Sequence, residues 1–180
     1  MSAHTAEMLA REGTFGELAP LYRQAGYWPR PVRPGSKACY VSKWQTPDPE
    51  RLAGELQSWL EQYPRHGIGV LLGSPFPDGT RLGAVDIDHD DYVRVVKALL
   101  LNPVCGRIGA KGIAYLIRIR GDGKYRALKV KGGVKVGEIL CDKRLLVLPP
   151  TIHPDINQPY RWIGKPLLET DYRELPIIEA

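Results

Sequence analysis

The 180-residue sequence lacks the features that define several classes of protein. No apolar run approaches the roughly 20 residues that a membrane-spanning helix needs. The first residues, among them His4, Glu7 and Arg11, lack the apolar core of a signal peptide. We therefore expect a cytoplasmic protein without a membrane partner.

Cysteine is scarce as well. Cys39, Cys105 and Cys141 are widely spaced and form no Cys-x-x-Cys pair, so the sequence predicts neither a disulfide framework nor a zinc site. A Walker A loop and a Gly-x-Gly-x-x-Gly fingerprint are also missing, which argues against a P-loop ATPase and a dehydrogenase. We interpret the three cysteines as buried thiols.

The remaining composition is that of a folded domain, with 43% hydrophobic and 25% charged residues. The length suits one compact unit, since most domains have about 100 to 200 residues. The net charge is +5, and the basic residues concentrate at 30–43 and 107–135. Clustered positive charge favours a polyanionic partner such as a nucleic acid or a nucleotide.

Apolar periodicity predicts an α/β or α+β sheet domain. The predicted helices cover 18–25, a segment that starts at a cap on Asp48 and runs to Leu60, and 92–101. The predicted strands are 68–72, 82–87, 114–119, 134–140 and 145–148. The turn-forming segment 74–79 predicts that the first two strands form a hairpin with a long loop, and the Pro- and Gly-rich segment 27–37 predicts an extended loop.

Two carboxylates end the strand 82–87. Because side chains alternate along a strand, Asp86 and Asp88 project from the same face. Their mutual repulsion is relieved by a divalent cation, so the pair predicts a Mg²⁺ or Mn²⁺ site of the kind that serves nucleotide chemistry. The alternatives are that both residues cap the next helix, or that they belong to a sugar-nucleotide transferase with an Asp-x-Asp pair.

Further candidates lie downstream. Glu138 would complete a carboxylate triad if its strand pairs with that of Asp86, and is otherwise a solvent-facing glutamate; Asp142, in an expected hairpin turn, is the second choice. The glycine-spaced segment 106–112 places Arg107 and Lys111 where they could cradle a triphosphate, unless it is only a solvated turn.

The string Pro149-Pro150-Thr151-Ile152-His153-Pro154 fixes an extended backbone after a strand. His153 could there contact phosphate or template, or be a buried structural histidine.

Together these strings resemble the N-terminal bifunctional primase-polymerase domain of replication proteins from phages, plasmids and other mobile elements, a branch of the archaeo-eukaryotic primase superfamily. The similarity covers about residues 18–165 of a single predicted domain, 1–180. It rests on Tyr22 to Gly26, Pro34-Gly35-Ser36-Lys37 with Trp44, Ile68-Gly69-Val70, Leu72-Gly73, Val85-Asp86-Ile87-Asp88, Gly106-Arg107-Ile108-Gly109, Val136-Gly137-Glu138, and Pro149 through Pro154 with Tyr160 and Trp162.

The resemblance implies a catalytic core with an RRM-like sheet joined to an N-terminal α/β unit. It implies that Asp86, Asp88 and Glu138 hold Mg²⁺ or Mn²⁺. The family's second motif has a histidine that contacts the nucleotide's phosphates, and this sequence has Ala114 at that position. Either Arg107, Lys111 or His153 supplies the phosphate contact, or position 114 was altered, or catalysis is lost while binding remains.

The resemblance also implies a function and partners. We expect metal-dependent, template-directed nucleotidyl transfer in a bacterial host cytoplasm, with a single-stranded DNA template or primer and (d)NTPs as partners. Lys37, Arg107, Lys111 and His153 are the candidates for nucleotide or template contacts. A degenerate domain that only binds single-stranded DNA or an origin is the alternative. The chain carries no helicase motif, and it is a candidate N-terminal part of a longer replication protein that works with a helicase.

Overall fold

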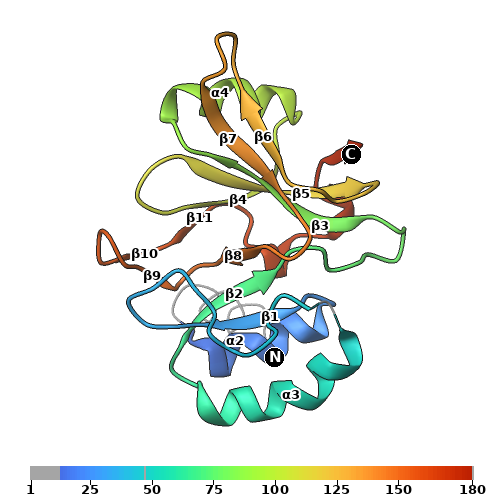
Figure 1. The fold of residues 1–180 in the computed structure, drawn as a ribbon, viewed down its shortest axis with the longest axis vertical. Coiled ribbons are helices and arrows are strands. Elements are labelled where there is room, and N and C mark those ends of the chain that lie inside the picture. Colours follow the sequence, from blue (N-terminus) through green and yellow to red (C-terminus); the bar gives the residue numbers. More distant parts are fainter. Residues whose placement is uncertain (1–12, 47, 180) are drawn as a thin grey trace.

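The computed structural model describes residues 13–46 and 48–179. It confirms a mixed fold of helices and mainly antiparallel sheets, and two layers are visible in Figure 1: an N-terminal unit below a larger sheet. No helix among the described residues is long and apolar enough to cross a membrane.

The N-terminal unit contains the first two predicted helices. Helix α2 (Phe15–Gln24) begins at a capping box, in which the Thr14 backbone N–H donates to Glu17 at 2.7 Å. Helix α3 (Pro49–Gln62) begins at Asp48, as predicted, because the Asp48 carboxylate accepts hydrogen bonds from two backbone N–H groups of the first turn. A three-stranded antiparallel sheet packs beside them, in the order β1 (Pro29–Val32), β2 (Gly67–Leu71) and β8 (Leu145–Val147).

The larger sheet has seven strands. Its order is β11 (Arg161–Gly164), β4 (Cys105–Ile108), β5 (Ile113–Arg120), β3 (Arg81–Ile87), β7 (Lys135–Leu140) and β6 (Arg126–Lys129), and β12 (Ile177–Glu179) pairs with β5 in parallel. The strands β9 (Ile152–His153) and β10 (Gln158–Pro159) form a small separate hairpin. Helix α4 (Asp90–Leu99) follows β3, and two short 3₁₀ helices, η1 (Leu167–Glu169) and η2 (Tyr172–Glu174), precede β12.

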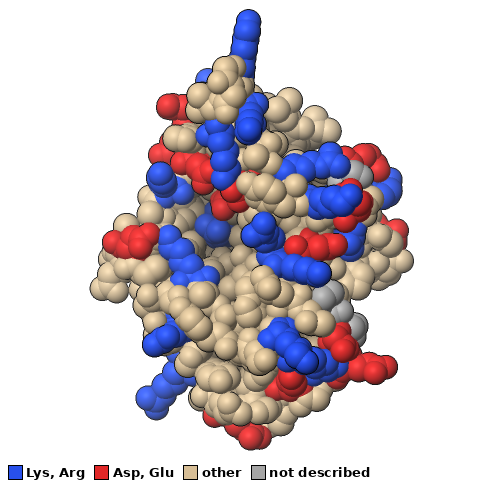
Figure 2. Space-filling model, in the orientation of Figure 1, with Lys and Arg blue, Asp and Glu red and all other residues tan. Residues whose placement is uncertain are grey.

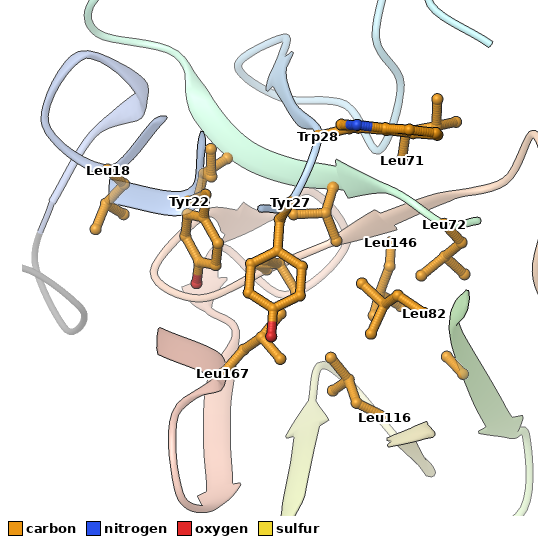
Figure 3. Packing of buried hydrophobic residues seen from close by; sticks show 14 of the residues in the cluster. Leu18, Tyr22, Tyr27, Trp28, Leu71, Leu72, Leu82, Leu116, Leu146 and Leu167 are labelled. Atoms are coloured by element: carbon orange, nitrogen blue, oxygen red, sulfur yellow. The ribbon is translucent and has the colours of Figure 1, made fainter. Parts of the chain in front are cut away.

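The two faces of the seven-stranded sheet are covered differently. Side chains such as Leu82 and Leu116 point toward the N-terminal unit and share a core with Tyr22 and Tyr27 (Figure 3). The opposite face carries Val85, Ile87 and Ile117, with α4 packed against it. No residue of α4 is fully buried. The face of the seven-stranded sheet that packs against the N-terminal unit is therefore more completely covered than the face under α4.

Some sequence predictions of pairing were wrong. Strands β2 and β3 do not form a hairpin: β2 pairs with β1 and β8, whereas β3 lies between β5 and β7. The segment after β2 leaves one sheet and enters the other. It pairs with the start of β3 only over residues 73–76 and 80–82, through a bridge between Pro75 and Arg81 and backbone hydrogen bonds such as that from the Gly73 N–H to the Leu82 carbonyl at 2.8 Å. Asp142 likewise connects strands of different sheets rather than turning a hairpin, and Pro149-Pro150 stands in a turn rather than in an extended segment. The expected loop 27–37 contains β1.

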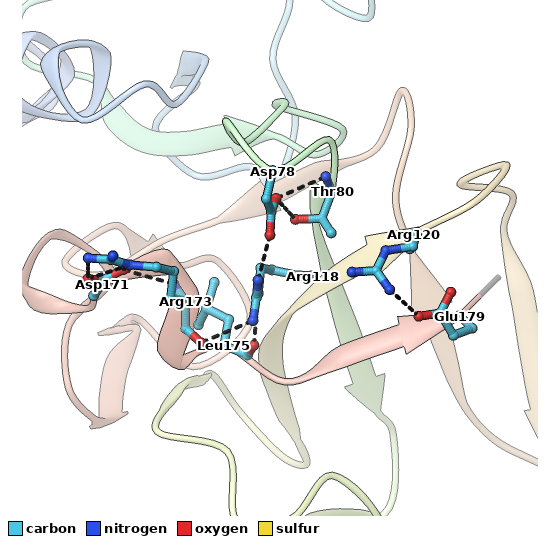
Figure 4. A network of polar contacts seen from close by, with 8 residues as sticks. All are labelled: Asp78, Thr80, Arg118, Arg120, Asp171, Arg173, Leu175 and Glu179. Atoms are coloured by element: carbon cyan, nitrogen blue, oxygen red, sulfur yellow. Dashed lines mark hydrogen bonds and ion pairs between the residues drawn. The ribbon is translucent and has the colours of Figure 1, made fainter.

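The C-terminal segment is fastened to the sheet by Arg118, which is 8% exposed. Its guanidinium donates to Asp78 at 2.7 Å and to the backbone carbonyls of Leu175 and Arg173 at 3.1 and 3.0 Å (Figure 4). A nearly buried cation is therefore neutralised and hydrogen-bonded, which a stable interior requires. The contact fixes the loop 76–80 and residues 173–175 to β5.

Candidate active site

One row of directly paired residues crosses the seven-stranded sheet. The pairs are Trp162–Arg107, Arg107–Ala114, Ala114–Asp86, Asp86–Glu138 and Glu138–Ala127. Directly paired residues of antiparallel strands put their side chains on the same face. The Asp86 row, as we call it, thus brings six strands to one line on the face toward the N-terminal unit.

Close backbone packing at Asp86 depends on glycine. A Cβ at position 137 would lie 2.4 Å from the Asp86 carbonyl oxygen, so only glycine fits there. A Cβ on Gly112 would lie 1.8 Å from the Ile87 carbonyl oxygen. The strands on both sides are therefore drawn tightly against the end of β3, and the Gly112 N–H is held by Asp90 at 2.9 Å.

The surroundings of the Asp86 carboxylate disfavour its negative charge. Burial raises its pKa above the ordinary value; Arg107 opposes that shift, and Asp88 and Glu138 add to it. Among the hydrogen bonds of the described residues, none is accepted by the side chains of Asp86 or Asp88. Asp88 instead continues the pairing through its backbone, which donates to the Val136 carbonyl at 3.0 Å.

Glu138 lies beside Asp86 in the row, as the sequence suggested, but its carboxylate is engaged elsewhere. Its Oε1 accepts hydrogen bonds from Tyr125 Oη, at 3.0 Å, and from Lys135 Nζ. Partial burial acts to raise the pKa of Glu138, but these two donors outweigh it and hold the pKa below its usual range.

A β-bulge makes the contact with Lys135 possible. Leu128 pairs with Gly137, whereas Lys129 pairs with Lys135, so Val136 is the extra residue. One inserted residue reverses the alternation of side chains. Val136 therefore lines the cavity under α4, and Lys135 lies on the face of Glu138.

Within residues 13–46 and 48–179, no three His, Cys, Asp or Glu side chains are grouped so that together they could hold a metal ion. The role of Glu138 as a metal ligand stays a prediction.

The opposite end of the row is cationic and aromatic. The Arg107 guanidinium stacks on the Tyr160 ring, with Cζ 4.9 Å from its centroid. Arg107 Nε and Trp162 Nε1 are buried, and neither has a hydrogen-bond partner among the described residues. Two adjacent buried donors without acceptors are costly unless a ligand supplies oxygen atoms.

His153 and Lys37 extend this cationic end. The His153 ring lies 5.0 Å from that of Tyr160, and its Nδ1 accepts a hydrogen bond from the Asp155 backbone at 3.2 Å. Burial lowers the pKa of His153, Lys37 and Arg107 lower it further, and Asp155 opposes them. Lys37 Nζ binds the Asp155 carboxylate at 2.9 Å. His153 is 4% exposed, so its ring is part of the packed interior. The Lys37 side chain, in contrast, is open to solvent.

Residues 19–178 match the family described as bifunctional DNA primase/polymerase, N-terminal. The chain belongs to this family. Membership confirms the resemblance drawn from the sequence strings and indicates a primase- or polymerase-type role in DNA replication. No curated protein is similar enough to the chain to match it.

The departure from the primase/polymerase pattern at Ala114 can now be placed. Ala114 is fully buried, between Arg107 and Asp86 in the row. The cation nearest to the position of the expected histidine is thus Arg107. Lys111 is exposed in the turn 109–112, and none of the hydrogen bonds among the described residues involves its side chain.

The structure adds residues that the sequence did not single out. Lys135 and Tyr125 bind Glu138, and no local pattern indicates this, because residues three apart on a regular strand face opposite sides. Tyr160 and Trp162 were noticed only as part of an unusual string; their alternation around Arg161 is the one signal that both belong to one face.

Proposed function

We propose that the chain is a metal-dependent, template-directed nucleotidyltransferase, a DNA primase or DNA polymerase that serves the replication of a phage or another mobile element. The Asp86 row carries this proposal, since it sets carboxylates and a partly buried guanidinium on one sheet face, with Ala114 between them. Transfer of a nucleotidyl group needs both. The carboxylates hold metal ions, and the metal ions together with the guanidinium stabilise the negative charge of the phosphates.

The carboxylate end fits a divalent ion. Asp88 lies close enough to Asp86 to disfavour the Asp86 charge, and no hydrogen bond among the described residues is accepted by either carboxylate. A Mg²⁺ ion is commonly held by one or two carboxylates together with substrate phosphates, so two aspartates suffice for a first ion. When bound, the metal would neutralise phosphate charge and activate the attacking 3′-hydroxyl. Glu138 would join Asp86 and Asp88 after releasing Lys135 and Tyr125.

The cationic end supports binding of the triphosphate. Arg107 presents an unpartnered buried Nε beside Ala114, and its stacking on Tyr160 holds the planar group in place. We assign Arg107 the phosphate contact that a histidine makes in relatives with the full motif. Lys37 and His153 lie further along this end, toward template or leaving phosphate, and Lys111 would close over the nucleotide from the turn 109–112.

Incorporation of a labelled nucleotide tests the function. With Mg²⁺ or Mn²⁺, (d)NTPs and a primed or unprimed single-stranded template, the wild-type chain should extend or initiate strands, and Asp86→Ala/Asp88→Ala should not. Absence of incorporation by the wild-type chain with either ion would contradict the proposal.

A second function is favoured by two observations: Ala114 replaces the histidine, and Glu138 is held by Lys135. A domain that only binds single-stranded DNA or an origin would explain both. Such a domain binds single strands with a steep salt dependence but shows no Mn²⁺-dependent affinity for (d)NTPs. The sugar-nucleotide transferase reading gains no support from membership of the primase/polymerase family.

A further inference from the structure

The β6–β7 hairpin projects from the seven-stranded sheet at the top of Figure 1. Residues 126–140 carry four Lys or Arg residues and one Glu, a net charge of +3, whereas the whole chain carries +5. Figure 2 shows Lys and Arg side chains gathered over this projection. The ribbon thus carries a clear local excess of positive charge, although it holds only four of the 25 Lys and Arg residues of the chain.

Like charges face each other on the hairpin. Lys129 and Lys135 are directly paired across the two strands, an arrangement that destabilises a sheet unless an anion lies nearby. Glu138 partly neutralises Lys135. Among the described residues, no ion pair involves Lys129 or Lys131, and Lys131 stands next to the tip formed by Gly132 and Gly133.

An aromatic ring continues the basic surface toward the Asp86 row. Tyr125 is 43% exposed, and the Arg144 guanidinium lies 5.1 Å from its ring centroid. The Tyr125 hydroxyl binds Glu138, so the base of the hairpin touches the row itself. Exposed rings beside cations are the elements on which single-stranded nucleic acids stack their bases.

We propose that the β6–β7 hairpin binds the backbone of a single-stranded nucleic acid and leads it to the Asp86 row. Lys129, Lys131 and Lys135 contact successive phosphates, and Tyr125 receives a base. The identification of this strand as the template rests on the proposed function; the binding itself does not. Because Lys135 also holds Glu138, a phosphate that binds Lys135 frees the Glu138 carboxylate.

Binding of single strands by hairpin variants tests the inference. We would titrate the chain with oligo(dT), and separately oligo(rU), of about 20 nucleotides and follow fluorescence anisotropy at several salt concentrations. Lys129→Gln/Lys131→Gln should bind roughly tenfold more weakly, and the slope of log K against log salt should become shallower by about 1.4, since each phosphate contact contributes about 0.7.

The matched control is Arg23→Gln/Arg65→Gln, which removes two cations from the N-terminal unit and should leave affinity and slope unchanged. Loss of folding does not confound the result, because removing the repulsion between Lys129 and Lys135 should keep or slightly raise the Tm. As a second variant, Tyr125→Leu should weaken binding without changing the salt slope.

Two results would overturn the inference: equal loss in the hairpin and control variants, or equally tight, hairpin-dependent binding of polyglutamate. The failures are separable. A hairpin-dependent affinity without nucleotide incorporation would refute the proposed function alone, whereas incorporation with a hairpin-independent affinity would refute the hairpin alone.

Discussion

The two ends of the Asp86 row are built in opposite ways. The cationic end is packed: Arg107 stacks on Tyr160, and Tyr160 contacts His153, both of these rings being 4% exposed. The carboxylate end is held only by polar contacts to the partly exposed Lys135 and Tyr125. In the proposed function, each end would meet a different requirement of one metal–nucleotide ligand.

The difference teaches which part of the site is preorganised. A guanidinium that is stacked on an aromatic ring loses little freedom when it binds phosphate, so it is ready before the ligand arrives. Carboxylates that repel each other form a stable site only when a cation neutralises them. We infer that the cationic end receives the nucleotide and that the carboxylate end is completed by the metal.

The largest expected effect comes from removing the charge at the carboxylate end. Asp86→Asn should lower nucleotide incorporation by at least about a hundredfold, since ions at such sites stabilise the transition state by several kcal/mol. The same change should keep or raise the Tm, because it removes a charge that burial disfavours.

Asp91→Asn is the matched control, since Asp91 is an exposed carboxylate at the start of α4. Its incorporation should equal that of the wild type. A loss of activity in Asp91→Asn as large as in Asp86→Asn would remove the special role of Asp86.

A change at the cationic end should act on nucleotide binding instead. Arg107→Met should weaken the affinity for (d)NTP about tenfold or more, the usual cost of a lost hydrogen bond to a charged group, and leave Mn²⁺ binding nearly intact. Arg107→Lys should recover only part of the loss because lysine lacks the planar group that stacks on Tyr160. Isothermal titration gives both affinities, and Arg161→Met, an exposed cation on β11, is the control.

The third effect is on the free energy of unfolding and comes from a substitution in the middle of the row. Ala114→His should lower the free energy of unfolding by about 1–3 kcal/mol, because position 114 is fully buried and the larger ring overpacks it. Ala127→His, at the exposed end of the same row, should change it little. Chemical denaturation measures both; a tolerated histidine at 114 would show that the row has room for the missing group.

The smallest effect is the pH dependence of His153. Burial lowers its pKa, so the folded state takes up a proton less readily than the unfolded state, and stability is lost as the pH falls below the ordinary value of about 6.5. His153→Gln does not titrate. The Tm advantage of the wild type over His153→Gln should therefore shrink between about pH 8 and pH 5, and a constant difference would argue against a buried neutral imidazole.

The sequence alone singled out the carboxylates of the row but not the contacts that hold Glu138. Strand alternation placed Asp86 and Asp88 on one face, and apolar runs located β3, β5 and β7. Register is not local information, so the pairing of Asp86 with Glu138 could only be conditional. The bulge at Val136, which brings Lys135 to Glu138, left no signal in the sequence.

The wrong hairpin between β2 and β3 has a similar cause. Both strands are short and apolar and are separated by turn residues, so local pattern favours their pairing. Their burial in two different layers depends on partners far along the chain, β8 for one and β7 for the other. The contact of Tyr160 with Arg107 likewise joins segments that are distant in the sequence.

The most direct test of the account is whether the two ends of the row act on one metal–nucleotide ligand. Electron paramagnetic resonance can follow the free Mn²⁺ while the chain is titrated with a non-reactive (d)NTP analogue. Wild-type chain should bind Mn²⁺ more tightly when the analogue is present. Asp86→Asn should lose Mn²⁺ binding, and Arg107→Met should retain Mn²⁺ binding but lose its enhancement by nucleotide. Binding of Mn²⁺ that is unaffected by nucleotide in the wild type, or unchanged in Asp86→Asn, would contradict the account.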